Sequence, residues 1–316
     1  MLMDYIDGST AFELSTVHGD PMSIPSQYRA HYFAQMANIM VDLASLRFPA
    51  IGSITSREGT LDPDIFVSPC ADRTIHSRDG SRIPSDVIIG PCADTYTGPY
   101  KTSADFYAKY PTALAETLNI HSSDGNDLVG LGIATELKKI HKLASSGSST
   151  SDDQNLFVLV NLEIGTHNVL VDSSYTIVGV IDWDSTFSLP IEAAHMFPFC
   201  AGAEPGVPGA VEEVSFICPP INDERRAVCE AFATAVGDAA KARSSTAEHA
   251  SGSESQHIGS SPSSKNMLTK DGFFTTEALA FRPLMFLKAK QDWVDKAWVP
   301  GLQYLQQAFS VKDHRY

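Results

Sequence analysis

Three polar residues, Glu163, Asn168 and Asp182, stand at the ends of short apolar runs in one segment of the chain. A carboxylate comes first, a carboxamide follows five residues later, and a second carboxylate comes after a predicted hairpin. In phosphoryl transfer, one carboxylate accepts or orients the proton of the attacking hydroxyl, and amide and carboxylate oxygens hold the Mg²⁺ on the phosphates. The pattern favours a phosphotransferase site with Glu163 as base and Asn168 and Asp182 as metal ligands.

Each of these residues also has a simpler interpretation. An acidic loop, a capping Asn and an exposed Asp occur on many ordinary hairpins. Their joint placement, followed by the sequence Ile181-Asp182-Trp183, favours the catalytic interpretation. Asp184 is either a further carboxylate of the site or an exposed loop residue. His167 either contacts substrate or phosphate, or is a loop histidine without a role.

The elements that must position these residues are visible in the hydrophobic pattern. Apolar runs at 156–160, 169–171 and 176–181 predict three strands close enough in sequence to form hairpins. A helix is predicted from Ser26, after Pro25, because apolar residues follow at helical spacing. Similar patterns predict further helices at 104–118, 128–143 and, with breaks, 276–309, and a short strand at 2–6.

Two stretches are predicted to lie outside the core. Residues 50–102 are rich in Gly, Pro, Ser and Asp and are expected to form an irregular excursion on the surface. Residues 243–265 are rich in Ser and poor in large apolar side chains, which predicts a disordered insertion.

Composition limits the class of protein. The formal charge of −15 argues against nucleic acid as a partner, because a polyanion repels an acidic surface. No apolar run reaches the roughly 18 residues that span a bilayer, so no membrane association is expected. The five cysteines are widely spaced and include no C-x-x-C pair, which predicts reduced thiols in a cytoplasmic protein and no zinc site.

Residues 159–172, followed by 178–184, resemble the catalytic and metal loops of the aminoglycoside phosphotransferase-like (choline-kinase-related) family, which has the protein-kinase-like fold. The family pattern is His-x-Asp-(x)4-Asn, followed by a hydrophobic strand pair that ends in Ile-Asp-Trp-Glu. Asn168 matches the metal-binding Asn, and Asp182, in VIDWD, matches the metal-binding Asp.

The resemblance continues upstream, where LMDYIDG at residues 2–8 is similar to the last N-lobe strand and the hinge. It implies that Met3, Asp4 and Ile6 contact the nucleotide, with backbone groups facing the adenine. It also implies an α+β protein in which residues 1–10 supply that strand and hinge. Residues 11–316 are then expected to form a helical C-lobe with short catalytic-loop hairpins, and the N-lobe is largely missing.

By the same resemblance, the cofactors are ATP and Mg²⁺, and the partner is a small molecule with an acceptor hydroxyl. Two positions depart from the pattern, because Glu163 replaces the catalytic Asp and Asn161 replaces the preceding His. A displacement of about 1 Å in a catalytic group can cost about a hundredfold in rate. The alternatives to an active enzyme are therefore a catalytically inactive kinase-like binding protein and a truncated fragment of an enzyme.

Overall fold

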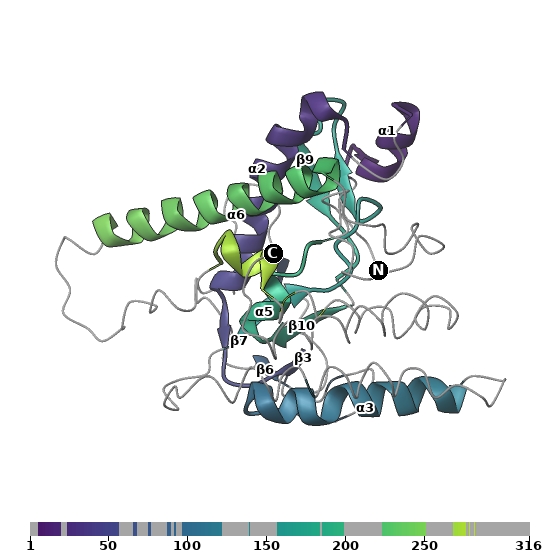
Figure 1. The fold of residues 1–316 in the computed structure, drawn as a ribbon, viewed down its shortest axis with the longest axis vertical. Coiled ribbons are helices and arrows are strands. Elements are labelled where there is room, and N and C mark those ends of the chain that lie inside the picture. Colours follow the sequence, from purple (N-terminus) through teal and green to yellow (C-terminus); the bar gives the residue numbers. More distant parts are fainter. Residues whose placement is uncertain are drawn as a thin grey trace.

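The fold combines antiparallel sheets with long helices, as seen in a computed structural model of the chain (Figure 1). The structure describes residues 6–19, 24–56, 66–67, 75–76, 87–89, 92, 97–121, 139, 157–183, 185–198, 223–250, 268–275, 278 and 281. The described helices are α1 (Ala11–Val17), α2 (Ser26–Ser45), α3 (Ser103–His121), α5 (Ile191–Ala194) and α6 (Asp223–Ala250), and the 3-10 helix η4 spans Asp271–Phe274. The predicted α+β class is confirmed.

Within the described residues, the strands form two sheets and a two-stranded ribbon, all with antiparallel pairing. The larger sheet has the order β2-β7-β10-β3-β6, the smaller one has the order β1-β8-β9, and β4 pairs with β5. Their bounds are β1 (Ser9–Thr10), β2 (Arg47–Phe48), β3 (Gly52–Ser56), β4 (Phe66–Val67), β5 (Ile75–His76), β6 (Val87–Ile89), β7 (Phe157–Asn161), β8 (Val169–Val171), β9 (Ile177–Val180) and β10 (Thr186–Leu189).

Helix α2 begins after Pro25, as predicted, and its buried residues recur at helical spacing. It packs against both α6 and β7, and Figure 1 shows α6 crossing it. Phe33 of α2 and Phe232 of α6 meet edge to face, with ring centroids 5.1 Å apart. In the view of Figure 1, the larger sheet lies between α6 and α3, and α3 confirms the helix predicted at 104–118.

The three strands predicted around the candidate site are confirmed as β7, β8 and β9, but they do not all pair with one another. β8 and β9 form a hairpin, whereas β7 pairs with β10 and β2 in the larger sheet. Every residue of β7 is buried, and such a strand needs neighbours on both edges and packing on both faces. The prediction of hairpins is therefore right for β8–β9 and wrong for β7.

The prediction that residues 50–102 form an irregular surface excursion is wrong for two of its segments. β3 pairs with β10, placing Ser53 opposite Phe187, and β6 pairs with β3 on its other edge. The sequence of β3, GSITS, has few apolar residues, so it carries little of the pattern that identifies a strand. Its place in the sheet depends on its partners.

The predicted disordered insertion at 243–265 is wrong at its beginning, because residues 243–250 continue α6. Arg243 forms an ion pair with the buried carboxylate of Asp42 on α2, which fixes this part of α6 against the core. The hydroxyl of Ser244 donates a hydrogen bond to the Ala240 carbonyl, 3.0 Å away, so this serine is accommodated within a helix. Residues 251–265 lie outside the described residues.

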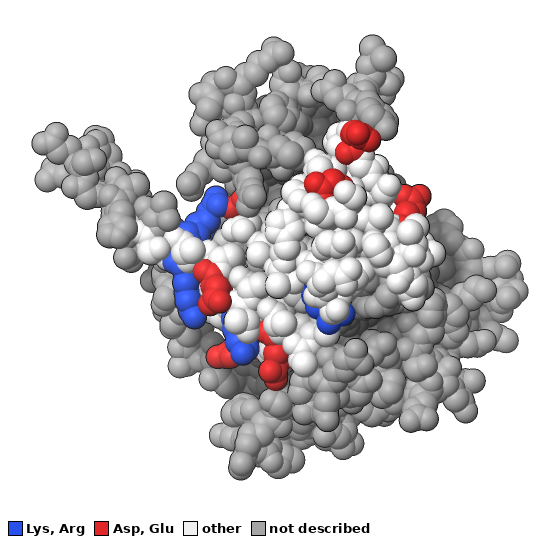
Figure 2. Space-filling model, turned by 90° about the horizontal axis from the view of Figure 1, so that it is seen from above, with Lys and Arg blue, Asp and Glu red and all other residues white. Residues whose placement is uncertain are grey.

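Other predicted elements also lie outside the described residues. These are most of the strand at 2–6, most of the helix at 128–143 and most of the helical segment 276–309. No described helix is both long enough and apolar enough to cross a membrane. Figure 2 shows basic and acidic side chains interspersed on the described part of one face. Exposed pairs of this kind occur within helices, such as Lys241–Asp238, separated by 3.8 Å.

Candidate functional site

The first part of the site is the turn that ends β7. Asn161, the last residue of the strand, is only 7% exposed, and its Oδ1 accepts a hydrogen bond from the backbone N–H of Glu163 at 2.8 Å. This contact from an Asn side chain to the amide two residues later closes a tight local turn. The turn ends the strand and brings Glu163, whose side chain is half-buried, out of the sheet at the C-terminal end of β7.

The second part is the loop from Glu163 to Asn168. The Nδ2 of Asn168 donates to the backbone carbonyl of Glu163 at 3.0 Å, and the N–H of Asn168 donates to the Gly165 carbonyl at 2.9 Å. Asn168 is only 5% exposed, so its carboxamide is held within the loop. Because Nδ2 is used inside the loop, Oδ1 is the atom of Asn168 that can act as a metal ligand.

The third part is the segment after β9. The N–H of Ile181 donates to the Asn168 carbonyl at 2.9 Å, and the carbonyl of Asp182 accepts from Nδ2 of Asn161 at 3.0 Å. Asp182 has a φ of 62°, in the left-handed region, and its side chain is exposed. Asp tolerates this region better than most residues. Such conformations concentrate at functional sites, where surrounding contacts maintain them.

The structure thus joins the loop that carries Glu163 and Asn168 to the segment that carries Asp182, through hydrogen bonds to the backbone of residues 181 and 182. The side chains of Asn161 and Asn168 and the backbone hydrogen bond from Ile181 to Asn168 make this connection. Asn161 contacts both loops, because it bonds to Glu163 and to Asp182. Sequence reasoning treated Asn161 only as a departure from a family pattern and missed this role. Its position, two residues before the candidate base, was the available signal.

The chemical fit of Mg²⁺ to these residues is good. The Oδ1 of Asn168 and the carboxylate of Asp182 are hard oxygen donors, which Mg²⁺ prefers. Among the described residues, no group of three or more His, Cys, Asp or Glu side chains is placed to hold a metal ion. A two-ligand arrangement is still typical of Mg²⁺ sites, where water and substrate phosphates complete the octahedron.

His167 is exposed on the same loop and packs its ring against the backbone of Gly165. A Cβ at position 165 would lie only 2.3 Å from the Cε1 atom of this ring. Glycine is therefore required here unless the ring moves. Asp184, the other secondary candidate, lies outside the described residues.

Of the residues predicted to contact a nucleotide, the structure describes Ile6, while Met3 and Asp4 lie outside the described residues. A Cβ placed on Gly179 of β9 would lie 3.1 Å from Cδ1 of Ile6, so this side chain covers the middle of β9. The chain then enters β1, which pairs with β8. The N-terminal segment consequently runs beside the hairpin that leads to Asp182.

The far end of the β8–β9 hairpin is firmly attached to α2. Gln35 of α2 accepts from the N–H of Ile177 at 2.8 Å and donates to the carbonyl of Tyr175 at 3.1 Å. Within the turn, hydrogen bonds from Ser174, and then from Thr176, hold the pKa of the Asp172 carboxyl below its usual value. These contacts give the hairpin a fixed position relative to the core.

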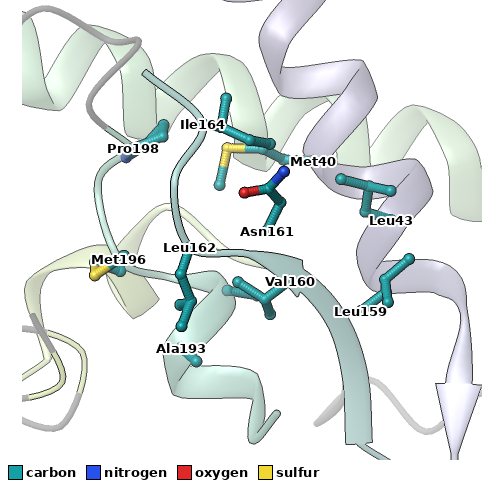
Figure 3. Close-up of a pocket in the computed structure, with 11 residues that line it drawn as sticks. Met40, Leu43, Leu159, Val160, Asn161, Leu162, Ile164, Ala193, Met196 and Pro198 are labelled. Atoms are coloured by element: carbon teal, nitrogen blue, oxygen red, sulfur yellow. The ribbon is translucent and has the colours of Figure 1, made fainter. Parts of the chain in front are cut away.

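A small cavity of about 30 Å³ lies behind the site, between α2, β7 and α5 (Figure 3). Apolar side chains line most of it, and the carboxamide of Asn161 is a polar group at its wall. Ligand sites for molecules of nucleotide size have volumes of several hundred Å³. This cavity has room for one or two water molecules and is too small to hold a nucleotide.

The chain was compared with protein-family models, with curated proteins and with solved structures, and none of them matches it.

Proposed function

We propose that this chain is an ATP- and Mg²⁺-dependent phosphotransferase with a protein-kinase-like fold, acting on a hydroxyl of a small molecule. The observation that supports the proposal is the junction of the two loops that carry Glu163, Asn168 and Asp182, which Asn161 joins by hydrogen bonds to both. Phosphoryl transfer requires a proton acceptor for the hydroxyl and oxygen ligands for Mg²⁺ at one place, and these three residues supply them.

Each residue has a defined task in this proposal. Glu163 accepts or orients the proton of the acceptor hydroxyl as the oxygen attacks the terminal phosphate. Asn168, through Oδ1, and Asp182, through its carboxylate, hold Mg²⁺, which neutralises charge on the phosphates. Burial of Asn168 and its bond to the Glu163 carbonyl hold the side chain of Asn168 against the backbone that carries the proposed base.

The proposed nucleotide position follows from the β8–β9 hairpin. Ile6 covers Gly179, and Asp182 lies three residues further along the chain. Three residues span at most roughly 10 Å, the length they have when fully extended. A nucleotide whose base lies near Ile6 would therefore extend along the hairpin and bring its phosphates toward Asp182.

A catalytically inactive binding protein of the same fold is the second candidate, and the identity of residue 163 favours it. Glu is one methylene longer than Asp, so its carboxylate is displaced from the position that the family pattern implies. Glu163→Asp and Glu163→Gln separate the two candidates. An active enzyme should lose ATP-dependent phosphorylation of the acceptor with Gln and retain or increase it with Asp.

Calorimetric titration with Mg²⁺–ATP tests the binding step that the phosphotransferase requires. Wild-type protein should bind, and Asp182→Asn should bind at least tenfold more weakly, because a charged ligand of the metal is lost. The control is Asp238→Asn, which removes an exposed carboxylate of α6 and should bind as wild type. Equal affinity in Asp182→Asn and wild type, or no binding by wild type, would refute the proposed function.

A further inference from the structure

We infer that Asn161 is a positioning residue that holds Asp182 in its left-handed backbone conformation and thereby sets the geometry of the metal site. The inference rests on the proposed function for its consequence, the placing of a metal ligand. Its structural content concerns only the backbone at position 182 and can be tested separately.

The two hydrogen bonds of Asn161 define the orientation of its carboxamide. The backbone carbonyl of Asp182 is an acceptor, so the atom of Asn161 that faces it must be a donor. The backbone N–H of Glu163 is a donor, so the atom that faces it must be an acceptor. Only one orientation of the amide satisfies both, with Nδ2 toward Asp182 and Oδ1 toward Glu163. Asn161 thus connects the two loops through opposite ends of one planar group.

Asp182 depends on contacts made by its backbone, because its side chain is exposed and cannot be held by packing. The preceding residue is fixed by the bond from the Ile181 N–H to the Asn168 carbonyl at 2.9 Å. The carbonyl of Asp182 is fixed by Asn161 at 3.0 Å. Along the backbone, the first bond precedes the φ and ψ angles of Asp182 and the second follows them. Together they restrict the backbone conformation of this residue.

The surroundings of Asn161 strengthen this constraint. Figure 3 shows its carboxamide close to Met40 and Ile164, and it is 7% exposed. Water competes poorly for a polar group in such a place, and removing one partner leaves the other without a hydrogen bond. If the bond to Asp182 is lost, its backbone can relax to an extended conformation, and the carboxylate that this residue carries then changes its position.

Two substitutions separate the two bonds of Asn161. Asn161→Asp, measured at pH 8 so that the carboxyl is ionised, keeps an oxygen that accepts from Glu163 but has no donor for the Asp182 carbonyl. Asn161→His keeps a ring N–H for that carbonyl, and the cavity of about 30 Å³ beside the side chain gives room for the larger ring. A general effect on packing would appear in both variants, whereas loss of the donor occurs only in Asn161→Asp.

The control is Asn38→Asp, which also removes an amide donor to a backbone carbonyl, that of Ala34 on exposed α2 surface. Backbone NMR chemical shifts of Asp182 report its conformation in the folded protein without any ligand. Wild type, Asn161→His and Asn38→Asp should give left-handed shifts, and Asn161→Asp should give extended ones. Left-handed shifts in Asn161→Asp, or extended shifts in Asn161→His, would overturn the inference. If Asn161→Asp does not fold, the Asn161→His result decides.

Mn²⁺ alone is the probe for the consequence at the metal site, since it broadens NMR signals near its binding position. In wild type it should broaden the signals of Asn168 and Asp182, and Asn161→Asp should bind it about five- to tenfold more weakly, the loss expected from one broken hydrogen bond. No broadening in wild type would contradict the proposed function. The role of Asn161 would then be decided by the chemical shifts of Asp182 alone. Unchanged Mn²⁺ affinity in an Asn161→Asp protein with extended Asp182 would overturn the positioning role.

Discussion

Acidification should weaken the fold through His195, the residue that ends α5. Its ring is buried: Nδ1 contacts the Ile191 carbonyl at 3.1 Å, and Nε2 accepts from the N–H of Thr269 at 3.1 Å. The ring of Phe273 meets it edge to face, with centroids 5.4 Å apart. Because Nε2 acts as an acceptor, the ring is neutral, and protonation there would break the bond to Thr269.

Burial lowers the pKa of His195 from 6.5 to about 4, and its hydrogen bond to Ile191 opposes this shift in part. Between these two pH values the unfolded chain binds a proton that the folded protein does not, so the free energy of unfolding falls as pH falls. The loss begins below about pH 6.5 and is complete near pH 4. A difference of about 2.5 pH units corresponds to about 3 kcal/mol in total, of which about 2 kcal/mol is lost by pH 5.

Urea denaturation at several pH values between 7 and 4.5 measures this loss. The variant His195→Gln cannot be protonated, so its free energy of unfolding should be lower at pH 7 but should change less between pH 7 and 5, by about 2 kcal/mol. The control is His18→Gln, which replaces an exposed histidine and should follow the wild-type profile. Parallel profiles for wild type and His195→Gln would refute the reasoning.

Further substitutions test the packing of the core, of the hairpin and of the site. Phe33→Ala should lower the free energy of unfolding by about 3–5 kcal/mol, because the Phe33 side chain is only 2% exposed. In the same denaturation assay, Phe12→Ala should lower it by less than about 1 kcal/mol, because the Phe12 side chain is 41% exposed. Gln35→Ala should cost about 1–3 kcal/mol and speed hydrogen exchange at the amide of Ile177, and unchanged exchange would contradict its attachment of the hairpin. Gly165→Ala should lower the free energy of unfolding by less than about 1 kcal/mol, because the His167 ring that the new methyl group meets is exposed and can rotate away, and adding His167→Ala should remove that cost.

The helices and the strands around the site could be predicted because their apolar residues repeat regularly. α2, α3, β8 and β9 all have that pattern. β3 could not be found in this way, since its polar sequence becomes a strand through pairing with β10 and β6. The helical state of residues 243–250 was missed because Ser-rich composition indicates disorder unless a contact such as Arg243–Asp42 is known.

The candidate site divides in a similar way. The types and spacing of Glu163, Asn168 and Asp182 are properties of the sequence, and the structure joins the two loops that carry them by hydrogen bonds. The role of Asn161 depends on a hydrogen bond to a backbone carbonyl 21 residues away. Backbone atoms are the same at every position, so no residue type at 182 could have identified Asn161 as their partner.

The position of a bound metal ion tests the central claim most directly. A crystal structure with Mn²⁺ and a non-hydrolysable ATP analogue would locate the ion by its anomalous scattering. The proposed site requires the ion within about 2.2 Å of Oδ1 of Asn168 and of a carboxylate oxygen of Asp182, with nucleotide phosphates among its remaining ligands. A nucleotide-bound metal that contacts neither residue would contradict the assignment of this site.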